Sequence, residues 1–472
     1  MTRVTGQTED GPGRWRNIFT GRLGVYTLIL NLGMAVFAIN HFVVSTIMPT
    51  VVADLGGLDF YTWAFSLFAV GSIIGAASAG PVSNAYGMRR VYAGSGLLMA
   101  AGLLGNGFAW DMPSVVAFRL VQGIGGGAVA SIAYGLVAVL YPHNLRSRVL
   151  AIVSCIWGIG TLAGPAFGGF FAEPGLWRGS FLAMMGFALI FAVLAWRYVD
   201  GEKEEGKLSD LPIWRLAMLT LSVLLMSATS LAKQDPSRIG LFGLAVVFAA
   251  VAFRRDARSV HNMFPRGITT IMSQLGAGYW VLFLVSIVLT AHNTYTTYYL
   301  QLLHGVAPLN AGYILAAQSM MWTVSALALS GIKQNAEPYL IAAGLLCMLM
   351  ASVGIALSLE HGPLAMIAGC LGLSGFGMGL INIPAMQRVI NAAAEADKQL
   401  AGISVQTIRN IGISFGAALT GMIAAMAGLA DDSSVAEVVR AMHWVYGVNI
   451  SFAVLALLAV IPVFIYRHDP PG

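Results

Sequence analysis

Four charged or titratable side chains interrupt long apolar stretches of the chain: His41, Arg119, His292 and Arg409. A charge at the centre of a bilayer costs about 2.5–3.5 kcal/mol even on lenient insertion scales, so such residues usually face the protein interior and mark function. Histidine titrates near neutral pH and can carry a proton. Arginine binds carboxylates and other planar anions through paired hydrogen bonds. The chemistry expected from these residues is proton transfer and anion recognition.

Carboxylates are missing from the same stretches. All 21 Asp and Glu residues fall in predicted loops, tails or segment edges. Asp54 lies at such an edge and is the candidate proton carrier if neither histidine serves. The structural alternatives remain open, because each arginine could cap carbonyls or join two helices, and His41 could be a neutral, hydrogen-bonded core residue. Asn40 precedes His41 and does not titrate. The two residues lie about 100° apart on a helix, so either could flank a cavity.

No enzyme constellation is found in the sequence. It contains no Walker-type phosphate loop and no His-Glu-x-x-His run. The run GIGGG at Gly123 lies inside an apolar segment with no preceding strand, so a phosphate-binding role lacks its structural context. Cys155, Cys347 and Cys370 are scattered through apolar segments and are interpreted as packing residues. We expect no disulfide, no metal and no cofactor.

The elements that position these side chains are predicted to be membrane-spanning helices. The chain is 57% apolar and only 10% charged, whereas a soluble domain carries about 25% charged residues. A spanning helix needs roughly 20 mainly apolar residues, and the short alternating segments of a β-barrel are not seen. The fold class is therefore all-α integral membrane. Fourteen spans are expected, at 24–48, 62–82, 91–109, 113–140, 149–172, 179–198, 212–231, 238–253, 275–302, 309–331, 338–358, 363–385, 400–428 and 442–466.

Charged linkers divide these spans into groups of six, two and six. The linkers are DGEKEEGKLSD from Asp200 and RRDARSVHNMFPRG from Arg254. We expect an N-terminal six-helix bundle over 1–198, a linker with two additional helices over 199–268, and a C-terminal six-helix bundle over 269–472. Weak similarity between the two halves suggests an internal repeat, and transporters built from repeats bind their substrates near the midplane between the halves.

The basic residues predict the orientation in the membrane. Of 26 Lys and Arg residues, twenty fall on the side of the termini, four on the other side, and two within spans. This asymmetry places both termini in the cytoplasm by the positive-inside rule. The net charge of +5 then reflects topology, and no nucleic-acid partner is expected.

Several motifs resemble those of the major facilitator superfamily. GPVSNAYGMRR from Gly80 is similar to its loop motif Gly-x-Leu-Ala-Asp-Arg-x-Gly-Arg-Arg, FRLVQGIGGG from Phe118 to its Arg-x-x-Gln-Gly motif, and GTLAGPAFGG from Gly160 to the Gly-Pro motif of its antiporters. VVSTIMPTVVADLGGLD, YYLQLLHGVAPLNAGY and VQTIRNIGISFGAAL resemble segments of the fourteen-helix drug:proton antiporter branch. The resemblance implies two pseudo-symmetric bundles that move a small solute by alternating access, usually outward.

Two positions depart from the family pattern. The acidic position of the loop motif is Asn84, so the cytoplasmic latch should be weaker by about 1 kcal/mol, since charged hydrogen bonds are about twice as strong as neutral ones. Asn40 occupies the place where this antiporter branch commonly carries a first-helix aspartate that binds protons. The titratable neighbour His41 and the histidine at 292 are then the leading proton carriers.

Gating residues are expected at two places. Gly80 and Gly87 should bracket a cytoplasmic turn near Asn84, with Arg89 and Arg90 anchoring the membrane surface. Glycines spaced by four residues share one helix face and allow close packing, and a proline can kink the helix beside them. This second group is Gly160, Gly164, Pro165 and Gly168.

The candidate substrate-binding residues are polar or aromatic and fall within spans. They are Asn40, His41, Arg119, Gln122, Trp157, His292, Tyr295, Tyr299, Gln318, Trp322, Asn382, Gln406, Arg409 and Asn410. A cation would need a buried carboxylate partner, so an anionic or neutral small molecule is expected, such as an aromatic acid or a siderophore-like chelator.

The expected function is proton-driven export by a monomeric transporter of the bacterial inner membrane. Facilitation or uptake without protons remains an alternative because the core lacks acids. A membrane sensor that does not transport is a further alternative, against which the polar residues of both halves argue.

Overall fold

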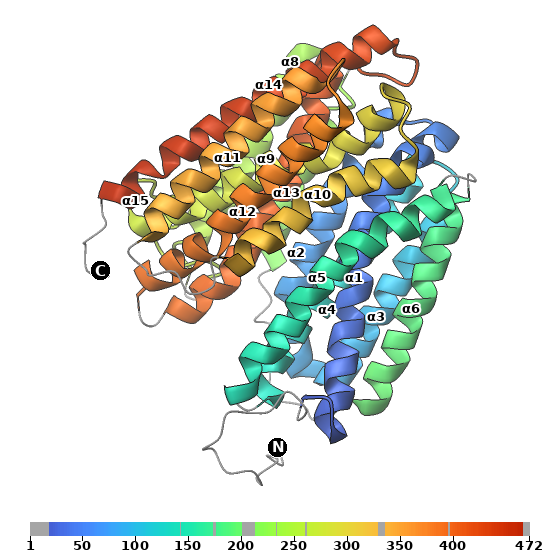
Figure 1. Ribbon diagram of the computed structural model, residues 1–472. Helices are drawn as coiled ribbons and strands as arrows, with labels where there is room; N and C mark the ends of the chain where they lie inside the picture. The colour runs from blue at the N-terminus through green and yellow to red at the C-terminus, as the bar shows by residue number, and fades with distance from the viewer. Residues whose placement is uncertain are drawn as a thin grey trace.

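The computed structural model describes residues 18–141, 143–172, 176–200, 213–232, 234–259, 262–328, 336–394 and 397–465. These ranges are helical, and each of the fourteen predicted spans corresponds to one long helix (Figure 1). The helices are α1 (Gly21–Leu55), α2 (Trp63–Tyr86), α3 (Met88–Gly107), α4 (Met112–Leu140), α5 (His143–Ala172), α6 (Trp177–Tyr198), α7 (Ile213–Ala228), α8 (Asp235–Asp256), α9 (Gln274–Leu302), α10 (Pro308–Ala328), α11 (Glu337–Ser358), α12 (Leu364–Ala392), α13 (Lys398–Met426), α14 (Val435–Ala459) and the short α15 (Ile461–Ile465), with a 3-10 turn η2 (Leu58–Phe60).

Length and apolar composition make this a multi-pass membrane protein. Within the described ranges, eleven segments are long and apolar enough to cross a bilayer. Polar residues fix where the helices begin. Asp111 caps α4 by accepting a hydrogen bond from the Ser114 amide at 2.8 Å, and Ser434 and Glu437 form a reciprocal capping box at the start of α14. Such caps satisfy amide groups that have no partner inside the helix.

Helices α1 to α6 pack into one bundle, the N bundle, and α9 to α14 into a second, the C bundle (Figure 1). The strongest pairs correspond between them: α2 packs on α4 as α10 does on α12, α1 on α5 as α9 on α13, and α3 on α6 as α11 on α14. Glycines bring two corresponding pairs into backbone contact. A Cβ at Gly75 of α2 would lie 2.0 Å from the Ile124 carbonyl oxygen, and a Cβ at Gly375 of α12 only 1.7 Å from that of Gln318.

The two bundles contact each other mainly at the end away from the chain termini, called here the closed end. The pairs that meet there are α5 with α10, α2 with α13, and α1 with α9. Figure 1 shows the bundles diverging from this end toward the termini. Among the described residues, the hydrogen bonds between the N and C bundles lie in the closed-end half, between 45–61 of one bundle and 294–301 or 431 of the other.

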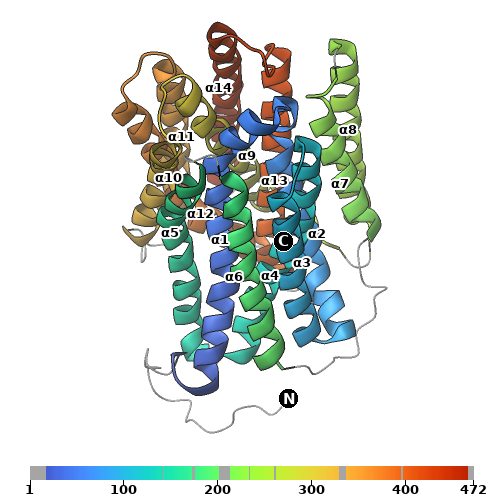
Figure 2. The ribbon, with the colours of Figure 1, turned by 90° about the vertical axis from the view of Figure 1, so that its right-hand side faces the viewer.

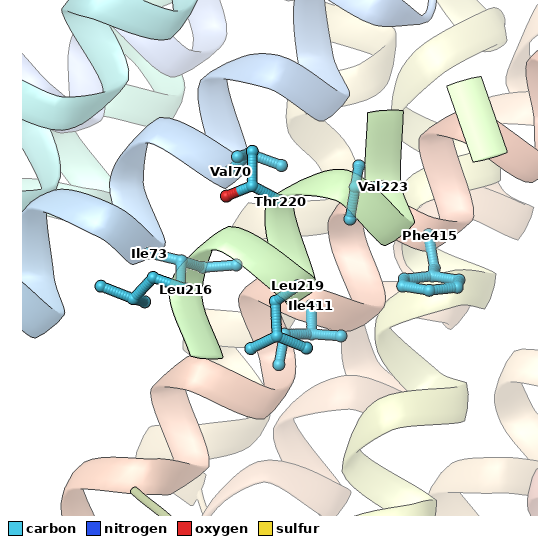
Figure 3. Close-up of a pocket in the computed structure, with 8 residues that line it drawn as sticks. All are labelled: Val70, Ile73, Leu216, Leu219, Thr220, Val223, Ile411 and Phe415. Atoms are coloured by element: carbon cyan, nitrogen blue, oxygen red, sulfur yellow. The ribbon is translucent and has the colours of Figure 1, made fainter. Parts of the chain in front are cut away.

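Helices α7 and α8 form a hairpin that lies outside both bundles, on the side opposite α5 and α10 (Figure 2). Near the closed end, α7 is hydrogen-bonded to α2: Ser66 and Ser227 hydroxyls lie 3.1 Å apart, and the Trp63 indole donates to Ser230 at 2.9 Å. Farther down, Leu216 and Leu219 of α7 pack with side chains of the C bundle. Figure 3 shows the apolar junction where α2, α7 and α13 meet.

Two expectations about local structure were wrong. Gly80 does not begin a turn, because α2 continues through Gly80 and Pro81 to Tyr86. The turn is made by Gly87 alone, whose φ of 91° is available to glycine at little cost, and α3 begins at the next residue. The first helix also extends beyond its predicted limit, passing through Pro49 to Leu55.

Candidate functional site

Polar and aromatic side chains of the N bundle gather around His41 at mid-helix level. The rings of His41 and Trp157 lie 6.4 Å apart, and Phe37 packs edge-on against Trp157 at 6.0 Å. His41 and Trp157 are both partly exposed, which keeps the imidazole accessible. Tyr134 of α4, 48% exposed, lies beside Trp157 and within electrostatic reach of Arg409 in the other bundle.

The C bundle contributes a second group around Arg409. Its guanidinium donates to the Asn382 amide oxygen at 3.1 Å and stacks over Trp322 at 5.3 Å. Among the described residues no carboxylate pairs with Arg409, and its Nε has no hydrogen-bond partner. Gln406 and Asn410 follow on the same helix, joined by a hydrogen bond of 3.1 Å.

These two groups approach each other across the bundles, since Tyr134 lies within electrostatic reach of Arg409, and together they are called here the central belt. The central belt consists of His41, Tyr134, Trp157, Trp322, Asn382, Gln406, Arg409 and Asn410, all of which are partly or fully exposed. It offers one uncompensated guanidinium, one imidazole, three aromatic rings and several amides. Such a set can bind an anionic or neutral molecule with a flat body through paired hydrogen bonds and stacking. Seven of its members were expected from the sequence, while Tyr134 was missed because one tyrosine in an apolar helix gives no distinguishing signal.

Arg119 does not belong to the central belt. Its side chain is only 1% exposed; Nε donates to the Ala64 carbonyl at 3.0 Å and Nη1 to Gln122 at 3.1 Å. The guanidinium also lies 4.0 Å above the Phe68 ring. These contacts join α2 to α4, so substrate binding by Arg119 and Gln122 is not supported, and the alternative that Arg119 locks two helices fits the geometry.

His292 lies inside the C bundle rather than between the bundles. It is fully buried, and its ring nitrogens lie 3.0 Å from the Ser374 hydroxyl and 3.1 Å from the Ser352 hydroxyl. Gln318 donates to the same Ser374 at 3.2 Å and is itself buried. Because both ring nitrogens are engaged by serine hydroxyls inside the bundle, His292 and Gln318 are assigned to a structural network joining α9, α10, α11 and α12.

Four other candidates also lie outside the central belt. Asn40 is fully buried, and neither amide atom has a hydrogen-bond partner in the protein. Tyr299 is buried against Tyr446, with ring centroids 6.0 Å apart, and Tyr295 belongs to the closed end. Asp54 accepts hydrogen bonds from Trp177 at 3.1 Å and Arg178 at 2.7 Å, so it serves an ion pair at the closed end.

The glycines of α5 pack against α1, as their spacing predicts. A Cβ at Gly164 would lie 2.3 Å from the Phe42 Cβ, and one at Gly168 would lie 3.1 Å from the Val43 carbonyl oxygen. Gly160 has ordinary contact with Ala38 at 3.4 Å. Pro165 points to the other bundle, because a Cβ at Gly312 of α10 would approach it to 2.7 Å. This helix therefore links α1 with the C bundle.

The loop-motif residues lie at the terminal end of the N bundle. Asn84 and Arg90 are exposed, and Arg89 donates to the Val199 carbonyl at 2.7 Å, tying α3 to the end of α6. Among the described residues Asn84 forms no hydrogen bond with the C bundle, since the bundles are apart at this end.

The closed end is held by residues that, apart from Tyr295, were not identified from the sequence, and Tyr295 had been expected to bind substrate. Tyr61 stacks on Tyr295 of the C bundle at 5.3 Å and donates to the Thr294 carbonyl at 2.8 Å. Asp431, between α13 and α14, accepts hydrogen bonds from the backbone amides of Gly57 at 2.9 Å and Leu58 at 2.8 Å. We call Tyr61, Tyr295 and Asp431, with the Gly57 and Leu58 amides, the closed-end latch.

Comparison with known proteins agrees with this architecture. The sequence profile described as Major Facilitator Superfamily matches residues 30–417. A protein of Mycobacterium tuberculosis named "Probable multidrug-efflux transporter" is 28% identical over 98% of both chains. The "Multidrug transporter protein MdtP" of Bacillus subtilis is 25% identical over 84% of this chain and 74% of its own.

Solved structures share the fold at low sequence identity. The crystal structure of a bacterial homologue of the human lysosomal transporter Spinster, described as inward-facing and unoccupied, aligns with a TM-score of 0.68 at 14% identity, covering 95% of this chain and 99% of that one. The nucleoside transporter NupG aligns with a TM-score of 0.64, covering 93% of this chain and all of that one.

Proposed function

The chain belongs to the major facilitator superfamily, and from this membership we propose that it exports a small anionic or neutral organic molecule by alternating access, driven by protons. It is a transporter and not an enzyme. The observation that carries the proposal is the central belt, where Arg409 has no carboxylate partner among the described residues. Its relatives named as multidrug-efflux proteins support the outward direction.

The orientation supports a substrate-loading state. The described basic residues at the terminal end include Arg22, Arg90, Arg197 and Arg255, whereas the closed end carries Arg178, Arg238 and Arg440. By the positive-inside rule the terminal end is then cytoplasmic. In this conformation the central belt would open to the cytoplasm of a bacterial inner-membrane protein, as an exporter requires before it binds its cargo.

Flux in proteoliposomes tests the proposal directly. Purified protein reconstituted alone, as the expected monomer, should move an anionic aromatic compound out of its cytoplasmic compartment. An imposed pH gradient of the physiological sign should accelerate the flux, and an uncoupler should remove the acceleration. Lack of any flux across a panel of anionic, neutral and cationic compounds would contradict the assignment and favour a membrane sensor.

His41 is the proton carrier that the geometry favours, since it is partly exposed in the central belt whereas His292 is enclosed by serines. Replacing His41 with glutamine keeps a polar side chain and removes the titratable group. We expect His41→Gln to lose the acceleration by a pH gradient, roughly to the level seen without a gradient, while substrate exchange continues. Flux is measured with and without the gradient, and His443→Gln, at an exposed residue of α14, is the control.

A transporter without proton coupling is the second candidate, favoured by the absence of any carboxylate from the central belt. Asp54 is committed to Trp177 and Arg178 and lies at the closed end. If wild-type flux follows only the substrate gradient and ignores pH, the protein is a facilitator, and the direction of transport is set by substrate concentration.

The closed-end latch predicts a conformational effect. Asp431→Ala removes both acceptors of the Gly57 and Leu58 amides, and hydrogen bonds to a charged group contribute about 1.5–3 kcal/mol. Because Asp431 is exposed to solvent, we expect the lower part of this range: the population open at the closed end should rise about tenfold. Cysteine accessibility from the outer side measures it. Asp432→Ala, at the adjacent exposed carboxylate, which forms no hydrogen bond across the bundles among the described residues, should leave accessibility unchanged.

A further inference from the structure

Helix α1 carries a proline where it enters the closed end. Proline has no backbone N–H, so Pro49 cannot donate to the carbonyl of Ser45, four residues earlier, and its ring pushes that carbonyl outward. Ser45 and Thr46 are almost fully buried, with exposed fractions of 2% and 1%. A buried carbonyl without a partner is costly, especially within a membrane. The sequence of α1 thus creates an acceptor that another part of the protein has to satisfy.

Helix α9 of the C bundle supplies the donors. The Thr297 hydroxyl donates to the Ser45 carbonyl at 2.7 Å, and the Gln301 amide donates to the Thr46 carbonyl at 3.2 Å. Thr297 and Gln301 are four residues apart and share one face of α9. The two acceptors are neighbours on α1, one turn before Pro49. Two donors and two acceptors therefore meet in register across the boundary between the bundles.

Three hydroxyls of α9 donate to carbonyls of their own helix, whereas the hydroxyl of Thr297 donates to another helix. Ser286, Thr290 and Thr294 donate to the carbonyls of Leu282, Ser286 and Thr290, each four residues back along α9. Such local bonds are the usual choice for hydroxyls in membrane helices. Thr297 is fully buried and donates across the bundles instead, which indicates that the carbonyl of Ser45, freed by Pro49, is the better acceptor.

We propose that Thr297 keeps the closed end shut by supplying to the Ser45 carbonyl the hydrogen bond that Pro49 cannot donate, and that Gln301 adds a second hydrogen bond to the neighbouring Thr46 carbonyl. The inference rests on the proposed alternating access, because opening this end must separate α1 from α9. When the two helices part, the Ser45 carbonyl loses its donor and has to be hydrated. Pro49 thus acts as a positioning residue that makes the closed end more favourable, through a carbonyl that an unbroken helix would have satisfied itself.

The experiment measures the conformational equilibrium and needs no transport, so its failure is distinguishable from failure of the proposed function. Spin labels are placed at Trp110 and Val435, exposed residues of the two bundles near the closed end, in protein whose native cysteines are replaced by serine. Distance distributions are recorded in lipid nanodiscs. Thr297→Val keeps the size of the side chain and removes the donor. We expect the ratio of open to closed protein at this end to rise about three- to tenfold.

Two further variants test whether the effect of Thr297→Val comes from loss of its hydrogen-bond donor. Thr297→Ser retains the hydroxyl and should keep the wild-type ratio. Gln301→Met removes the weaker, longer hydrogen bond and should raise the ratio less than Thr297→Val does. Asp431→Ala removes the hydrogen bonds that the Gly57 and Leu58 amides donate across the closed end, which involve neither Pro49 nor Thr297. It is the control for loss of closed-end bonds that do not depend on Pro49.

The decisive measurement is a double-mutant cycle with Pro49→Ala, which restores the N–H that the Ser45 carbonyl lacks. In that background the change caused by Thr297→Val should shrink to less than about twofold, while that of Asp431→Ala should persist. Equal effects of Thr297→Val with and without Pro49 would overturn the proposal, as would an unchanged ratio in Thr297→Val itself. If Pro49→Ala does not yield folded protein, the contrast of Thr297→Val with Thr297→Ser decides, and equal ratios in these two variants reject it.

Discussion

Replacing Arg409 with glutamine should lower the affinity of the transporter for an anionic aromatic compound by about ten- to a hundredfold. Hydrogen bonds to charged groups contribute about 1.5–3 kcal/mol, and the guanidinium of Arg409 has no competing carboxylate among the described residues. Glutamine retains one donor that can still reach Asn382, so the change removes charge and paired geometry more than size. Binding is measured by calorimetry or by fluorescence of the central-belt tryptophans.

Matched compounds and a matched variant test whether the loss of affinity is caused by loss of the positive charge of Arg409. A neutral ester of the same aromatic compound should lose at most about threefold in affinity. Arg440→Gln, an exposed arginine of the closed end, should change neither value. Tight binding of quaternary ammonium compounds that is indifferent to Arg409 would contradict the proposed substrate class.

Gly375→Ala should strongly destabilise the C bundle. The new Cβ would lie 1.7 Å from the Gln318 carbonyl oxygen and 2.5 Å from its carbon, and a backbone carbonyl cannot rotate away as a side chain can. The helix pair α10–α12 must separate, and overpacking of a core typically costs about 1–3 kcal/mol or more. Thermal unfolding of the detergent-solubilised protein, followed by loss of the monodisperse peak on gel filtration, measures the effect.

Gly369→Ala provides the control on the same helix, because a Cβ there meets no atom within 4 Å. Its unfolding temperature should equal that of the wild type or rise slightly, since alanine favours helix. A similar contrast exists in α2, where Gly75 is tightly packed and Gly80 is open. Equal stability of Gly375→Ala and Gly369→Ala would show that α10 and α12 adjust more easily than their backbone contact suggests.

The helices could be predicted from the sequence because the bilayer imposes their length. Each apolar stretch is separated from the next by short polar breaks, and α9, predicted at 275–302, begins one residue earlier at Gln274. The exceptions have physical causes. Gly80 and Gly87 were expected to bracket a turn, yet α2 continues through Gly80 and Pro81 and ends only at Gly87, which has a positive φ.

The candidate site was harder to predict, because burial depends on which way each helix faces. The sequence showed that Arg119 and Arg409 lie in apolar segments but not that Phe68, Ala64 and Gln122 enclose the first. Polarity identified both arginines equally well. Only the packing of α2 on α4 distinguishes the structural arginine from the accessible one.

Contacts between distant segments could not be predicted at all from one sequence. Asp431 meets the amide of Gly57 across 374 positions, and its own neighbourhood resembles any polar loop. Residue types likewise do not show that Thr297 donates to the Ser45 carbonyl. Pro49 shows only that one backbone hydrogen bond of α1 is missing. A proline in a predicted span is therefore a reason to look for a donor on a facing helix.

The position of the α7–α8 hairpin makes the protein asymmetric within the plane of the membrane. Acyl chains reach the junction of α5 with α10 directly, whereas at the junction of α2 with α13 they meet α7 and, beyond it, α8, whose most apolar stretch is only 11% buried. Lateral pressure from the surrounding lipid consequently acts directly on the bundles at the α5–α10 junction. At the α2–α13 junction it acts on the α7–α8 hairpin instead. A change in lipid composition should therefore bias the tilt of the bundles toward one side rather than compress them evenly.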